Sequence, residues 1–157
     1  MKILFVCMGN ICRSPTAETI FKNKLKNNDL EAKIQVDSCG IIDYHVGEKA
    51  DARMRKHASK RGHEIKSIAR QFNPENDFNE FDYIIVMDDD NLNDIHKLDP
   101  EKKHRHKVHK MTDFSQKATH YDHIPDPYYG GTDGFEIVID MLEDACEGLV
   151  IKVKDSI

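Results

Sequence analysis

The sequence lacks a long hydrophobic run, a high cysteine content and an excess of positive charge. Near the N-terminus only six consecutive apolar residues, 3–8, precede Gly9, which is too few for a signal-peptide core or a bilayer span. Four cysteines in 157 residues are too few for a disulfide scaffold, and the net charge of −5 argues against a general nucleic-acid-binding protein. We therefore expect a cytoplasmic protein with reduced thiols, no membrane span and no nucleic-acid partner.

Internal repeats, low-complexity tracts and linkers are also missing. A chain of 157 residues with 39% hydrophobic and 32% charged content is typical of one globular domain that buries a substantial core. We expect a single domain over residues 1–157, and a monomer.

Apolar segments typical of strands alternate with segments of helical periodicity. The predicted strands cover residues 2–7, 34–38, 83–87 and 107–111. The predicted helices cover residues 15–28, residues 51–61 before Gly62, a short segment from Asp88 to about Leu98, and the C-terminus from about Asp133. This alternation predicts an α/β fold with a mostly parallel sheet, helices on both faces and ligands at the carboxyl ends of the strands.

The segment after the first strand is typical of a phosphate site. It reads Cys7-Met8-Gly9-Asn10-Ile11-Cys12-Arg13. The Cys7 thiol can act as a nucleophile, the Arg13 guanidinium can bind two phosphate oxygens, and the five residues between can turn their N–H groups toward an anion. Ser14 is predicted to cap a helix that begins at Pro15, and a helix N-terminus favours both phosphate and a thiolate. The alternative is a buried Cys7 in an ordinary turn, with Arg13 in solvent.

The candidate proton donor is Asp126, in the last third of the chain. Asp126 precedes Pro127, which restricts the backbone of the acid, although the same pattern is typical of a surface turn. The other candidates are Asp88, Asp122 and His123.

Tyrosines offer walls for an aromatic substrate. Tyr128 and Tyr129, with Tyr44, could form a slot whose walls stack on an aromatic ligand. His45 and Val46 would help to select the partners that fit. The alternative is that these tyrosines are half-buried loop residues.

The basic segment over residues 102–110 has two interpretations. It could be a nucleic-acid or metal patch, but its histidines fit no standard zinc spacing and no aromatic residue interrupts it. A solvated loop leading into a short strand is the favoured interpretation, and no metal site is predicted.

Two separated motifs resemble the signatures of the low-molecular-weight protein tyrosine phosphatases. They are Val6–Pro15 and Asp126-Pro127-Tyr128-Tyr129-Gly130, with further similarity at Val36–Ser38, Ala69–Gln71 and Phe81–Ile84. The resemblance implies a three-layer α/β/α fold with a four-stranded parallel sheet of flavodoxin-like order 2-1-3-4. It also implies hydrolysis of phosphotyrosine proteins and small aryl phosphates, an acid phosphatase activity, through a phosphocysteine intermediate and without a cofactor.

The resemblance also implies residue roles. Cys7 would be the nucleophile, and Asp126 would be the acid and then the base. Asn10, Ser14 and Ser38 would support the loop. The loop would bind phosphate, or oxyanion inhibitors, through Met8, Gly9, Asn10, Ile11, Cys12, Arg13 and Ser14. The chain departs from some relatives at Ser67, where they have a histidine.

The positions of the cysteines help to distinguish a phosphatase from the alternative functions. A thioredoxin-coupled arsenate reductase would need further cysteines around residues 80–90, which contain none. Cys12 is a candidate redox partner for Cys7, since a disulfide would protect and inactivate the nucleophile; its alternative is a packing residue, as expected for Cys39 and Cys146. A non-catalytic phosphotyrosine-binding module stays open as the other alternative.

Overall fold

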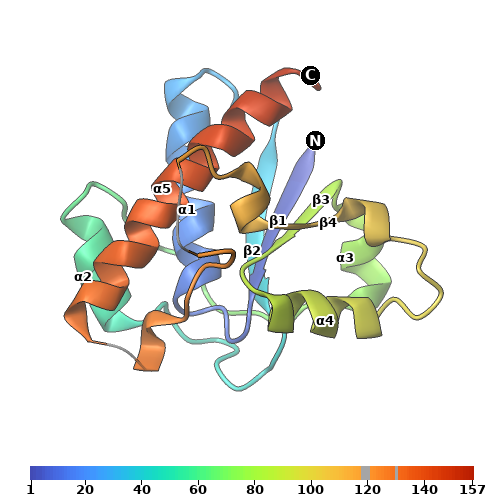
Figure 1. The fold of residues 1–157 in the computed structure, drawn as a ribbon, viewed down its shortest axis with the longest axis horizontal. Helices are drawn as coiled ribbons and strands as arrows, with labels where there is room; N and C mark the ends of the chain where they lie inside the picture. The colour runs from blue at the N-terminus through green and yellow to red at the C-terminus, as the bar shows by residue number, and fades with distance from the viewer. Residues whose placement is uncertain (118–120, 130) are drawn as a thin grey trace.

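A four-stranded parallel sheet forms the centre of the protein in a computed structural model that describes residues 1–117, 121–129 and 131–157 (Figure 1). Its strands are β1 (Lys2–Cys7), β2 (Gln35–Gly40), β3 (Tyr83–Val86) and β4 (Val108–Lys110). Their order is β2-β1-β3-β4, and every neighbouring pair is parallel. The predicted sheet order 2-1-3-4 is thus confirmed.

Helices cover both faces of the sheet, which confirms the three predicted layers (Figure 1). One face carries α1 (Arg13–Asn27), α2 (Ala52–Ser59) and α5 (Thr132–Lys154), and the other carries α3 (Pro74–Glu80) and α4 (Asp89–Lys97). The described residues also form the short 3₁₀ helices η1 (Arg105–Lys107), η2 (Met111–Phe114) and η3 (Pro127–Tyr129). Among the residues described, no helix is long and apolar enough to cross a membrane.

The central strand β1 places Cys7 at the carboxyl edge of the sheet. Ile3 and Phe5 pack toward α1 and α5, whereas Leu4 and Val6 pack toward α3 and α4. Because successive side chains of a strand point to opposite faces, an uninterrupted apolar run fits a strand that is buried on both sides. The strand therefore ends with the thiol between β2 and β3, where parallel sheets bind ligands.

Two local predictions were wrong or incomplete. The helix α1 begins at Arg13, so Ser14 lies in its first turn and is not its N-cap; the cap position is Cys12, without a side-chain hydrogen bond. The helix α3 was not predicted, although Asn73 caps it by accepting from the Glu75 N–H and Pro74 is its first residue. Seven residues are too few to show a helical period.

The basic segment forms a loop, the short helix η1 and strand β4, as its favoured interpretation predicted. Two of its histidines take part in packing. The His104 ring stacks on Phe78 with 4.8 Å between ring centroids, and the His109 ring lies 5.2 Å from that of Tyr83. These rings hold the segment against α3 and β3.

Candidate active site

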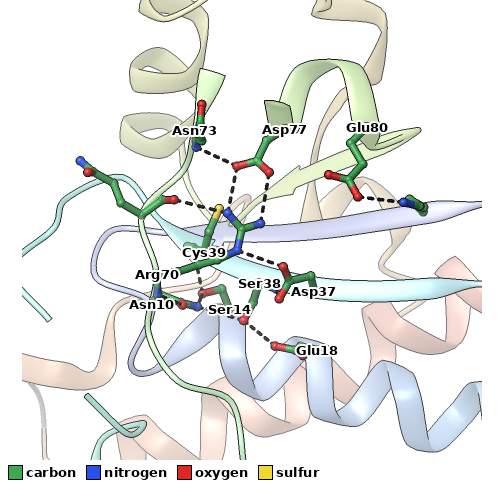
Figure 2. A network of polar contacts seen from close by, with 12 residues as sticks. Asn10, Ser14, Glu18, Asp37, Ser38, Cys39, Arg70, Asn73, Asp77 and Glu80 are labelled. Atoms are coloured by element: carbon green, nitrogen blue, oxygen red, sulfur yellow. Dashed lines mark hydrogen bonds and ion pairs between the residues drawn. The ribbon is translucent and has the colours of Figure 1, made fainter. Parts of the chain in front are cut away.

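The phosphate loop, residues 7–13, is held in shape from within by Asn10. Its φ of 57° lies in the left-handed region, which asparagine tolerates better than most residues. The Asn10 amide donates to Ser14 Oγ at 2.8 Å and to Ser38 Oγ at 3.0 Å, and its Oδ1 accepts the Arg70 N–H at 3.0 Å (Figure 2). The buried Asn10 therefore ties the loop to α1, to β2 and to the segment before α3.

Arg70 anchors this support through an ion-pair network (Figure 2). Its guanidinium donates to Asp37 at 2.9 Å and twice to the buried Asp77, at 3.0 and 3.2 Å. Burial opposes the charge, but the hydrogen bonds to Asp77 and the nearby negative charges raise the pKa of Arg70. Ser67, where some relatives have a histidine, is half-buried, and its buried Oγ has no hydrogen-bond partner in the described part of the chain. From this side the Arg70 main chain supplies the bond to Asn10.

The end of β2 packs directly against the phosphate loop. A Cβ atom on Gly40 would lie 2.9 Å from the Gly9 carbonyl carbon and from the Met8 carbonyl oxygen. Immediately after Gly40, the N–H groups of Ile41 and Ile42 donate to the carbonyls of Cys7 and Met8, each at 3.0 Å. Only glycine fits this approach, which closes one side of the loop.

The Cys7 thiol is 3% exposed and faces the Ser14 hydroxyl, with 3.0 Å between Sγ and Oγ. Because Ser14 Oγ already accepts from Asn10, its own proton is free to point at Cys7 or at the Cys39 carbonyl, 3.3 Å away. The Ser14 hydroxyl is thus within hydrogen-bond distance of the Cys7 sulfur.

The Arg13 side chain is only 2% exposed and reaches three acceptors around the loop. Its Nη1 donates to Asp88 at 2.5 Å and to the Ile124 carbonyl at 3.0 Å, and its Nη2 lies 3.5 Å from Asp126 Oδ2. Burial disfavours the charged form, but the charge at Cys7 and the hydrogen bond to Asp88 outweigh it and raise the pKa of Arg13. Arg13 is therefore a fixed cation whose remaining N–H donors can bind an anion.

Among the candidate proton donors, only Asp126 lines the hollow in front of the loop. Its Oδ1 accepts the Tyr128 N–H at 3.0 Å, which leaves Oδ2 toward Arg13. Asp88 is instead paired with Arg13 and caps α4. Asp122 is exposed and pairs with His123 at 2.9 Å.

These groups line one hollow of about 50 Å³ at the carboxyl edge of the sheet. The residues that line it are Cys7, Met8, Gly9, Ile11, Cys12, Arg13, Ile42, Asp126 and Tyr128. Asn10 and Ser14 lie behind the loop. Ile42 was missed by sequence reasoning; the apolar pair that follows Gly40 at the carboxyl end of β2 was the available signal.

The predicted tyrosine walls are only partly present. Tyr128 lines the hollow, whereas Tyr44 is 80% exposed, lies outside the lining and packs its ring edge-on against His45. The side chain of Tyr129 lies outside the described part of the structure. The walls of the hollow are therefore made by Met8, Ile42 and Tyr128.

The four cysteines are unpaired and buried. Cys7 and Cys12 line the same hollow, and burial raises the pKa of the Cys12 thiol. Burial likewise raises the pKa of Cys39 and of Cys146, which lie in the apolar core as packing residues. A redox role for Cys12 stays a prediction.

Known proteins are similar to this chain in both sequence and fold. Residues 2–157 match the family described as low molecular weight phosphotyrosine protein phosphatase. A Synechocystis protein assigned as a low molecular weight protein-tyrosine-phosphatase is 51% identical over 150 residues, which cover 96% of this chain and 94% of that protein. The Schizosaccharomyces pombe low molecular weight phosphotyrosine protein phosphatase is 41% identical over 136 residues, covering 86% and 85%. The crystal structure of the Entamoeba histolytica protein tyrosine phosphatase superposes with a TM-score of 0.95 at 47% identity, covering 99% of this chain and 98% of that one.

Proposed function

Because the chain belongs to the low molecular weight phosphotyrosine protein phosphatase family, we propose that it hydrolyses phosphotyrosine in proteins, and small aryl phosphates, with Cys7 as the nucleophile. The observation that carries the proposal is the meeting of a thiol, a buried guanidinium and a carboxylate in one hollow of about 50 Å³. Its small size suits a phosphate group. The substrate ring would lie at the mouth, against Tyr128 and Ile42.

In the first step the Cys7 thiolate attacks phosphorus in line with the leaving oxygen. The sulfur–phosphorus bond forms while the bond from phosphorus to the phenolic oxygen breaks, and Asp126 gives its proton to that oxygen. Arg13 and the loop N–H groups hold the three equatorial oxygens, whose charge they stabilise in the transition state. The products of this step are a phosphocysteine, a free tyrosine side chain and an ionised Asp126.

In the second step water hydrolyses the phosphocysteine. Asp126, now ionised, takes a proton from a water molecule. The oxygen of that water forms a bond to phosphorus while the sulfur–phosphorus bond breaks. The Ser14 hydroxyl, 3.0 Å from Cys7 Sγ, stabilises the departing thiolate. Inorganic phosphate is released and both groups return to their starting forms.

The shape of the hollow supports selection of phosphotyrosine over phosphoserine. Cys7 lies below the rim formed by the exposed side chains of Met8, Ile42 and Tyr128, so a phosphate must be carried on a long, flat group to reach it. Apolar rim residues also favour an aromatic ring over the short serine side chain. Phosphate and other tetrahedral oxyanions should compete with substrate for the loop.

The test is hydrolysis of p-nitrophenyl phosphate at mildly acidic pH with EDTA present. We expect Cys7→Ser to abolish turnover, and Asp126→Ala to lower kcat by a factor of about 10² to 10⁴, the usual contribution of a general acid. Cys146→Ser and Asp122→Ala are matched controls, one a buried cysteine and one an exposed aspartate, and both should retain activity.

The outcomes separate the alternatives. A folded wild-type protein that retains phosphotyrosine on a resin without turnover would contradict the proposal and favour a binding module. Arsenate reduction coupled to thioredoxin, without phosphatase activity, would favour the reductase. Loss of activity in Asp122→Ala equal to that in Asp126→Ala would refute the acid assignment.

A further inference from the structure

Arg53, in the first turn of α2, packs against the acid segment, residues 126–129. Its Nη2 donates to the Tyr128 carbonyl oxygen at 3.2 Å, and its Cζ lies 5.3 Å from the centroid of the Tyr128 ring. The same guanidinium lies 5.0 Å from the ring centroid of Phe135, a buried residue of α5. A planar cation in contact with two aromatic rings is favoured by cation–π attraction. Arg53 thus joins the acid segment to the helical layer.

Asp51 fixes the guanidinium in place and also touches the phosphate loop. The Asp51 carboxylate accepts from Arg53 Nε at 3.2 Å and from Nη2 at 3.0 Å, so the pair is bidentate. The Asp51 main-chain N–H donates to the Ile11 carbonyl of the phosphate loop at 2.8 Å. Burial of Asp51 opposes its charge, but the hydrogen bonds from Arg53 and from the α2 N–H groups lower its pKa. The pair is therefore charged, and it contacts both functional segments.

The acid is connected to Arg53 through one residue. Tyr128 is held by Arg53 at its carbonyl and at its ring, and the Tyr128 N–H donates to Asp126 Oδ1 at 3.0 Å. That bond turns the other carboxylate oxygen toward Arg13 in the hollow. Arg53 itself does not line the hollow, and its link to Asp126 runs through Tyr128.

We propose that Arg53 is a positioning residue that orients Asp126 for proton transfer to the leaving oxygen. The inference rests on the proposed function and deepens it. Its consequence is specific, because a misplaced acid slows only the departure of oxygens that need a proton. p-Nitrophenolate, the weaker base, needs that proton less than phenolate does, and phenolate is the closer mimic of tyrosine. Arg53 therefore matters more for natural substrates than for activated ones.

The experiment compares kcat/KM for phenyl phosphate with kcat/KM for p-nitrophenyl phosphate. We expect Arg53→Ala to lower the ratio of the two by about tenfold, part of the full contribution of a general acid. Arg53→Lys keeps the charge but not the planar fork, and should recover part of the ratio. The matched control is Arg55→Ala on the same helix, where Arg55 Nε donates to the Ala50 carbonyl; the ratio should not change.

The ratio excludes a purely structural explanation, since a smaller folded fraction lowers both rates equally and cancels. An Arg53→Ala ratio equal to that of wild type would overturn the inference, whatever the fall in absolute rate. Asp126→Ala provides the benchmark: it should lower the ratio further, and adding Arg53→Ala to it should change nothing more. If Asp126→Ala leaves the ratio unchanged, the acid assignment itself fails, and the positioning role fails with it. A changed ratio in Asp126→Ala with an unchanged one in Arg53→Ala refutes only the role of Arg53.

Discussion

Replacing Asn10 by alanine removes three hydrogen bonds and leaves alanine in a left-handed backbone conformation. The lost bonds are those to Ser14, to Ser38 and from the Arg70 N–H, and all three lie in the interior or at its edge. The backbone φ of 57° remains imposed by the loop, which is fixed on both sides by β1 and α1. The substitution therefore tests directly how strongly the phosphate loop is held.

The expected loss of stability follows from these contacts. A buried hydrogen bond contributes about 1 kcal/mol, so three contribute about 3 kcal/mol. The left-handed conformation costs alanine about 1 kcal/mol more than asparagine, which tolerates it through local hydrogen bonding. We expect the free energy of unfolding to fall by about 4 kcal/mol.

The assay is urea unfolding followed by far-UV circular dichroism. With a slope of about 2 kcal/mol per molar urea for a domain of this size, the midpoint should fall by about 2 M. Asp29→Ala is the matched control: its φ is 56°, but the residue is exposed at the end of α1, so only the conformational cost of about 1 kcal/mol applies. Equal midpoint shifts for the two variants would refute the assignment of stability to the Asn10 side chain.

Two further predictions concern the loop support and acid stability. Gly40→Ala should displace the phosphate-loop backbone, lower kcat/KM for p-nitrophenyl phosphate by at least about tenfold and cost about 2 kcal/mol in stability. The control is Gly131→Ala, where the new Cβ has no atom within 4 Å and activity should be kept. Full activity in Gly40→Ala would contradict the close approach. Hydrogen bonds from His57 and Arg61 lower the pKa of Glu136 from its usual 4.5, so its contribution to stability is present above that value and disappears as the pH falls through the lowered one. The melting temperature of wild type should therefore fall more steeply than that of Glu136→Gln between about pH 5 and about pH 3, and parallel curves would refute the contribution.

Much of the fold was predictable because its signals are local. The run over residues 2–7 is apolar without alternation, as a strand buried on both faces requires, and the seven residues of the Cys7–Arg13 loop carry their chemistry in their side chains. The order of the strands came from resemblance to a family and was confirmed. Short elements such as α3 gave no periodicity to detect.

The remaining details of the site depend on contacts between distant segments. The Arg70 N–H that donates to Asn10 belongs to the main chain, so the residue type at position 70 does not predict this bond. Ile42 reaches the hollow only because β2 ends beside the loop. Ser14 was predicted as a helix cap because serine favours that position. Its hydroxyl instead faces Cys7 and Asn10, since tertiary contacts supply better partners than the helix end.

The parallel order of the strands also governs when the site exists during biosynthesis. Every neighbouring strand pair of the sheet is parallel and far apart in the sequence, so each pairing must first overcome the entropy of closing a long loop. Cys7 is synthesised before Asp126, which follows only after β4. A nascent or truncated chain therefore carries the thiol without its proton donor. Oxyanions that bind the finished loop but not the incomplete chain would then stabilise only the full-length fold, by mass action.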